Sequence, residues 1–269
     1  MKRGRRILLV AAGAVAVLTV VFLLWPRERE PSYQGKKLSE WLILSEGLDS
    51  PQTKAAQEAV RHIGTNAIPV LLDWLDYEPP AWKKKLMPTV LPVGQWDGTA
   101  VLELLLGRKG EMHATLAELG FEILGPEARC AVPELTRRMN TRTSMSGDRA
   151  VLALANIGKE GLVPLVMALT NAQAINRAGA AAYIGFVMAG PTKTNTLDAV
   201  DAVPALVQCI GDKDSIVARC SVMTLGRLRL LPNVVMPALT NALADPRPDI
   251  RSEASMALDS FAGRWPLFR

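Results

Sequence analysis

Few residues of this chain could do chemistry, and none stands at the spacing that chemistry requires. His62 and His113 are the only histidines, and neither has an acidic companion at a metal-ligand spacing. The sequence holds no HExxH, GxSxG, phosphate loop or glycine-rich dinucleotide turn. We therefore expect a non-enzyme with no catalytic residue, no metal site, no cofactor and no small-molecule substrate. Each histidine is interpreted as a surface or groove residue of its helix.

The three cysteines, Cys130, Cys209 and Cys220, form no CxxC pair and have no metal-type spacing. Each lies in an alanine-rich helical stretch, which is typical of a small buried apolar side chain. Cys209 and Cys220 fall on consecutive helices of neighbouring units. A disulfide between them stays open as an alternative if the domain lies outside the cytoplasm.

Two charged clusters could form sites but have simpler explanations. Glu111, Glu118 and Glu122 follow helical spacing, and a solvated helix face explains them better than paired acid–base carboxylates. Residues 83–85 are three lysines directly after Trp82. They indicate either a solvated face or a surface for an acidic lipid or an acidic protein.

The N-terminal region predicts a membrane anchor. Residues 7–25 carry no charge and would span roughly 28 Å as a helix, close to the hydrocarbon thickness of a bilayer. A cleaved signal peptide is the competing interpretation, but the run is long and no small residues follow it. The basic flank 1–6 favours a cytoplasmic N-terminus. We expect a single-pass protein of a bacterial inner membrane, with the domain after the linker 26–37 in the periplasm.

Composition argues against nucleic acid as a partner. The net charge is +5, but most of it comes from Lys2, Arg3, Arg5 and Arg6 at the tip of the chain. The rest of the protein carries only about +1, whereas a protein that follows phosphates spreads its cations over one face of the fold.

A recurring proline phrase predicts the architecture of residues 38–269. An apolar residue and a proline open five runs of leucine, valine and alanine at Ile68-Pro69, Val132-Pro133, Val163-Pro164, Val203-Pro204 and Met236-Pro237. Most of these prolines lie about 30 to 40 residues apart, a period typical of stacked helical pairs. Each phrase follows a helix that ends near a glycine. We expect an all-α fold, an α-solenoid of about six helical pairs.

The turns between pairs resemble HEAT repeats, particularly the short HEAT-like kind first described for phycobilisome lyases. The resemblance rests on segments 212–219 and 245–251, on Arg177 with its following alanines, and on the Val-Pro-x-Leu phrase. An aspartate in such a turn can cap the incoming helix, and the arginine can bridge back to the turn. Residues 33–42 resemble a segment of membrane-anchored bacterial HEAT-repeat proteins. Two stretches depart from the pattern: 77–110, and a polar insertion at 189–201 that we expect to be exposed.

The resemblance implies a non-catalytic scaffold for protein partners in the bacterial envelope. In HEAT proteins the second helix of each pair lines the concave side, where partners bind. Residues four or five positions after each proline are therefore candidate partner-binding residues: Asp73, Arg137, Arg138, Gln208 and Asn241. Two other readings stay open, a lyase-type enzyme and a nucleic-acid-binding HEAT protein.

Overall fold

A computed structural model describes residues 30–47, 50–78, 109–141, 145–189 and 196–263. The described residues fall within one compact unit, Pro31–Arg269, except for Glu30. The predicted membrane span 7–25 and the lysines at 83–85 lie outside the described residues. Among the described residues, no helix is long and apolar enough to cross a membrane.

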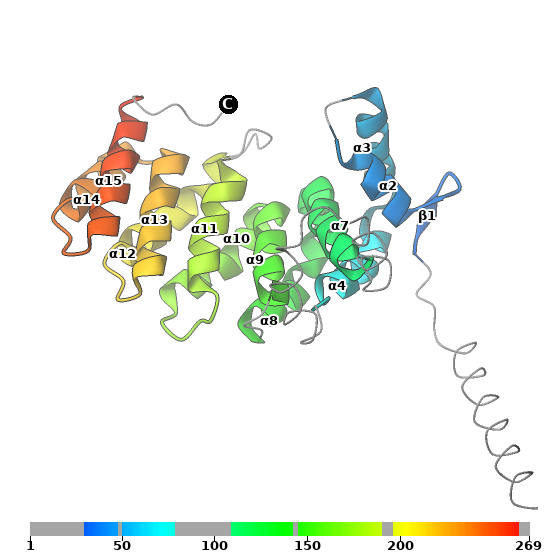
Figure 1. Cartoon of the computed structure of the whole chain (residues 1–269), viewed down its shortest axis with the longest axis horizontal. Coiled ribbons are helices and arrows are strands. Elements are labelled where there is room, and N and C mark those ends of the chain that lie inside the picture. Colours follow the sequence, from blue (N-terminus) through cyan, green and yellow to red (C-terminus); the bar gives the residue numbers. More distant parts are fainter. Residues whose placement is uncertain (1–29, 48–49, 79–108, 142–144, 190–195, 264–269) are drawn as a thin grey trace, which may run out of the picture. The chain divides into compact units, whose positions relative to one another are not determined.

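The unit is built almost entirely of helices, as the sequence predicts (Figure 1). A short antiparallel hairpin, β1 (Ser32–Tyr33) and β2 (Lys36–Lys37), comes first. The α-helices are α2 (Leu38–Ser45), α3 (Pro51–Ile63), α4 (Ile68–Leu75), α7 (Lys109–Leu124), α8 (Val132–Thr141), α9 (Met145–Ile157), α10 (Lys159–Thr170), α11 (Arg177–Met188), α12 (Val203–Cys209), α13 (Ser215–Leu228), α14 (Pro232–Ala242) and α15 (Pro248–Phe261).

In chain order, the described residues hold five pairs of a first and a second helix: α3/α4, α7/α8, α9/α10, α11/α12 and α13/α14. Each second helix packs on the first helix that follows it. The last described helix, α15, packs on α13 and α14. This agrees with the repeat read from the sequence. The stretch that would hold a sixth pair, 77–110, lies largely outside the described residues.

The proline phrase opens three of the five second helices as predicted. Helices α4, α8 and α12 each begin one residue before the proline, where a missing backbone N–H leaves no hydrogen bond unmade. A 3₁₀ turn precedes each of these helices: η1 (Gly64–Ala67), η2 (Gly125–Ala131) and η3 (Thr196–Ala202). The prediction of an exposed polar loop at 189–201 is therefore partly wrong. The 3₁₀ turn η3 leads into α12, as η1 and η2 lead into α4 and α8, and its Ala199 is buried.

In the other two pairs the second helix begins earlier than predicted. Helix α10 begins at Lys159, directly after Gly158 with its φ of 89°, so Pro164 lies inside the helix. Helix α14 begins at Pro232, which takes the first helical position and leaves Pro237 inside. A proline within the helix removes one i→i−4 bond.

Side-chain caps fix where helices begin. Ser50 caps α3 by accepting a hydrogen bond from the Thr53 amide at 3.1 Å, and Gly64 ends that helix with a φ of 59°. Asp214 caps α13 by accepting from the Ile216 amide at 2.8 Å. An aspartate thus caps an incoming helix, as the HEAT-like turn implies.

Part of the predicted linker 26–37 is ordered against the first helices. The Trp41 indole N–H donates to the Tyr33 carbonyl at 3.0 Å, and the Tyr33 ring lies 4.3 Å from the His62 ring. Lys36 places its ammonium 4.6 Å above the Trp41 ring. The hairpin therefore belongs to the folded unit.

First helices of successive pairs approach one another closely where a small residue faces the next helix. A Cβ added at Gly185 of α11 would lie 2.3 Å from Thr224 Oγ1 of α13, and one at Gly226 would lie 2.7 Å from the Ala257 Cβ of α15. Each contact also carries a buried hydrogen bond: Thr224 donates to the Ala181 carbonyl at 2.7 Å, and Ser260 donates to the Gly226 carbonyl at 2.9 Å. Glycine is thus required here for packing between pairs.

This close approach predicts that Gly185→Ala destabilises the protein by about 1 to 3 kcal/mol, because the new methyl group overlaps Thr224. Denaturant unfolding of the purified protein measures the loss. Gly211→Ala is the matched control, since a Cβ there meets nothing within 4 Å. An equal effect of the two substitutions would contradict the packing argument.

Candidate partner-binding surface

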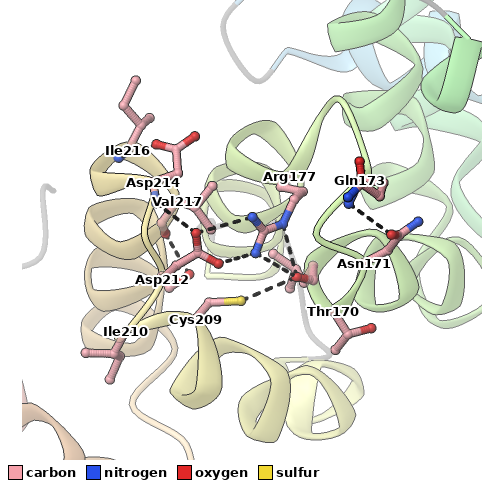
Figure 2. A network of polar contacts seen from close by, with 12 residues as sticks. Thr170, Asn171, Gln173, Arg177, Cys209, Ile210, Asp212, Asp214, Ile216 and Val217 are labelled. Atoms are coloured by element: carbon pink, nitrogen blue, oxygen red, sulfur yellow. Dashed lines mark hydrogen bonds and ion pairs between the residues drawn. The ribbon is translucent and has the colours of Figure 1, made fainter.

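The carboxyl ends of the second helices are held by donors that follow them in the sequence. Arg177, the first residue of α11, donates from Nε to the Leu169 carbonyl in the last turn of α10 at 3.4 Å. Its guanidinium also pairs with Asp212, which lies in the turn after α12 (Figure 2). The last carbonyls of a helix have no hydrogen-bond partner within the helix and carry partial negative charge. A cationic donor at this end therefore supplies both the missing hydrogen bond and a favourable charge. Arg177 therefore joins two consecutive second helices.

The same arrangement recurs one unit later. Arg247, just before α15, donates to the Asp212 carbonyl at 2.8 Å and to the Ile210 carbonyl at 3.3 Å, beyond the end of α12. It is itself held by Asp245 at 2.9 Å. The hydrogen bonds from Arg247 lower the pKa of Asp245 to about 2, and those from Arg177 lower the pKa of Asp212. Both carboxylates therefore stay ionised at neutral pH.

The carboxyl end of α4 is held by two arginines from the following pairs. Arg138 of α8 donates to the Leu72 carbonyl and lies 2.9 Å from Asp76. Arg149 of α9 donates to the Tyr77 carbonyl at 2.6 Å and lies 3.4 Å from Glu118. These bonds span 66 to 74 residues of sequence, so they hold the end of α4 to the helices that follow it among the described residues.

Two further donors complete the pattern. Asn176 donates from its amide to the Met139 carbonyl in α8 at 2.7 Å. Arg251 of α15 donates to the Asp245 carbonyl, after α14, at 2.8 Å. Every second helix of the described pairs therefore has a carbonyl at or beyond its last turn bound by a later side chain. These bonds hold the carboxyl end of each second helix in place and so help to set which of its residues face solvent.

Four of the five candidate partner-binding residues lie exposed at equivalent positions of different second helices. Each stands two residues after a fully buried leucine: Asp73 on α4, Arg137 on α8, Gln208 on α12 and Asn241 on α14. Contacts between α10 and α12, and between α12 and α14, place neighbouring second helices side by side. We name these positions, together with Met167 described below, the second-helix row.

Arg137 and Arg138 have different surroundings. The side chain of Arg137 is 56% exposed and pairs with Glu134 at 2.6 Å, whereas that of Arg138 is 9% exposed. Arg138 also bonds Glu134 at 2.8 Å, and the two arginines lower the pKa of Glu134 to about 2. Arg138 is thus built into the packing of α8 on α4, while Arg137 faces solvent.

Sequence reasoning missed the member of the row on α10, which is Met167. Its side chain is 66% exposed and follows the buried Leu165 by two residues. The prediction counted from the proline, and in α10 the proline is displaced by one position. Counting from the buried leucine, which is shared by all five second helices, would have found Met167.

The other chemistry-bearing residues lie in structural contacts. The His62 ring lies tilted against the Tyr33 ring, and the His113 ring stacks on the Trp74 ring at 4.3 Å between centroids. All three cysteines are free; Cys209 is buried, but Cys130 is exposed, so the prediction of a buried side chain is wrong for Cys130. Its position in η2, outside the apolar stripe of a helix, explains the difference. Among the described residues, no group of three histidine, cysteine or acidic side chains could hold a metal ion.

The predicted solvated face of glutamates is wrong for Glu118. Burial raises the pKa of Glu118, and Arg149 opposes that shift. Burial likewise raises the pKa of Asp148 and of Tyr183, which lie on α9 and α11. These groups gather where three first helices pack, away from the second-helix row.

Comparison with known proteins agrees with the repeat. Residues 177–259 match the family model for HEAT repeats. No curated protein matches the chain. Among solved structures, an engineered protein from a structural genomics consortium is 19% identical, with 84% of this chain and 97% of that chain covered and a TM-score of 0.41. A designed armadillo repeat protein is 16% identical over 84% of this chain and all of that chain, with a TM-score of 0.35. The segment 177–259 is therefore HEAT-like by sequence and by its helical pairs.

The contrast between the two arginines can be measured. Arg138→Met should lower the free energy of unfolding by about 1 to 3 kcal/mol, because it removes the ion pair with Asp76 and the hydrogen bond to the Leu72 carbonyl made by a largely buried guanidinium. Arg137→Met is the matched control and should leave stability unchanged, since its ion pair is exposed. Denaturant unfolding of both variants decides the matter; equal stability would assign Arg138 to the surface.

Proposed function

We propose that this protein is a non-catalytic scaffold that binds protein partners through its second-helix row. The observation that carries the proposal is that the polar side chains fall into two groups, those bonded within the fold and those exposed on the row. Arg138, Arg149, Arg177 and Arg247 are used within the fold, whereas the row residues are exposed on five successive second helices. A surface repeated from unit to unit offers a long contact to an extended partner.

The scaffold is tethered to a bacterial inner membrane by residues 7–25, with the folded unit in the periplasm. This part of the proposal rests on the uncharged run and on the basic flank before it. The ordered hairpin at 32–37 begins only a few residues after that run.

The exposed thiol of Cys130 provides a test of location. In spheroplasts, a membrane-impermeant maleimide should label Cys130 of the full chain without lysis, because this side chain is exposed while Cys209 is buried. Cys130→Ser should abolish most of the labelling and serves as the control. Labelling that appears only after the membrane is permeabilised would place the folded unit in the cytoplasm.

Partner binding is tested by cross-linking a C-terminally tagged full chain in its native membrane and identifying what is captured by mass spectrometry. We expect one or two envelope proteins at near-stoichiometric level. The double variant Arg137→Glu/Gln208→Glu should reduce their recovery at least about tenfold, since it places two new charges on the row. Both side chains are exposed, so the fold should be kept.

Glu122→Arg, an equally exposed charge change on the first helix α7, is the matched control and should not affect capture. Arg138 is left unchanged because its substitution would test packing instead of binding. Capture that survives the double variant would remove this part of the row from the site. Recovery of cytosolic proteins alone would contradict the envelope location.

A further inference from the structure

The C-terminal part of the second-helix surface carries no charge at all. Segments 161–176, 202–211 and 230–244 hold most of α10, all of α12 and all of α14, and none contains a lysine, arginine, aspartate or glutamate. Charge returns at their edges, with Lys159 and Glu160 in the first turn of α10 before the first segment and Asp201 before the second. We name the exposed side of these three segments the neutral face.

The neutral face also exposes large apolar side chains. Val163 and Met167 are exposed on α10, at positions one helical turn apart. Val234, Met236 and Leu243 are exposed on or just after α14. Between them, α12 presents Pro204 and Gln208. Helix α12 contacts both α10 and α14, so the three helices lie side by side. Val163, Met167 and Val234 share the side of the second-helix row, whereas Met236 and Leu243 lie on another side of α14.

Most other helices carry more charge than this face, but residues 178–189 of the first helix α11 and its C-cap are also uncharged and expose Phe186. The second helices α4 and α8 expose Asp73 and the Glu134–Arg137 pair. The first helices α13 and α15, which flank α14, carry Arg219, Arg227, Asp249 and Arg251. A soluble surface normally mixes both signs of charge, so three second helices without a charge beyond the first turn of α10 form an exception.

We propose that the neutral face binds an uncharged, apolar polypeptide segment of another protein. A charged side chain placed there would lose its hydration and find no counter-ion, which costs several kcal/mol. An apolar side chain would instead remove Val163, Met167 and Val234 from water. The amide groups of Gln208 and Asn241 supply both donors and acceptors for the backbone of such a segment. This inference rests on the proposed function and adds the chemistry of the partner.

Site-specific photocross-linking tests the proposal in cells that produce the full chain. A photoreactive amino acid replaces Met167 in one strain and Phe186 in another, and the cross-linked peptides are sequenced by mass spectrometry. Phe186 is the matched control because it is 64% exposed, against 66% for Met167, but lies on the first helix α11. We expect cross-links from position 167 to a segment of another protein that has no charged residue within about three positions of the cross-link.

The outcomes test the neutral-face proposal and the scaffold function separately. A partner segment with charged residues at the cross-link would overturn the neutral-face proposal and leave the scaffold function standing. A cross-link to a second copy of this chain would overturn it too, and would make the face a self-association surface. No cross-link from position 167 would overturn the proposal, and loss of capture by the Arg137→Glu/Gln208→Glu variant would then decide separately whether the scaffold stands.

A charge substitution gives a second measure. Met167→Glu should reduce the yield of cross-linking from a probe at position 208 at least about tenfold, whereas Met167→Leu should keep it. Phe186→Glu should have no effect. In isolated membranes the yield should not change between about 50 and 500 mM salt, because the contact involves no ion pairs. A steep fall with salt would contradict an uncharged contact.

Discussion

The structure depends on a repeated contact between a cationic side chain and the carboxyl end of a helix. The second helices are short, from 7 residues in α12 to 12 in α10. Helices of this length are marginal by themselves, and their last carbonyls would face water or lie unpaired. Arg138, Arg149, Arg177 and Arg247 bind those carbonyls from later parts of the chain. Each contact therefore completes one helix and sets its position relative to another unit.

The first helices are joined by a different interaction, close packing at small residues. Gly185 lies against Thr224 and Gly226 lies against Ala257, with a buried hydroxyl bonding the opposite backbone at each contact. A linear array has no distant contacts to correct an error in one interface, so each interface must fix its own geometry. In the C-terminal part of the array, Gly185 and Gly226 thus set the packing of first helices, and Arg177 and Arg247 set that of second helices.

The repeat, the pairing of helices and most second-helix starts were predictable from the sequence, because the proline phrase reports directly on helix geometry. The local signal failed in α10 and α14, where Gly158 and Pro232 start the helix earlier than the phrase indicates. It also failed for Arg138, which looks like Arg137 in sequence yet is buried. The partner that buries it, the carboxyl end of α4, lies 66 residues away and leaves no local pattern. Met167 was missed because a proline was used as the reference where the buried leucine is the constant feature.

The two interfaces also explain why a neutral face can exist. Ionic side chains near α10, α12 and α14 are drawn to the turns, where Arg177, Asp212, Asp245 and Arg247 are held by one another and by carbonyl groups. The outward sides of these helices take no part in that network, so stability places no demand for charge there. Solubility, by contrast, favours charged side chains on an exposed surface, and the outward sides of these helices do not carry them. A surface without charge over segments 161–176, 202–211 and 230–244, which exposes Val163, Met167 and Val234, is explained by an apolar partner that covers it.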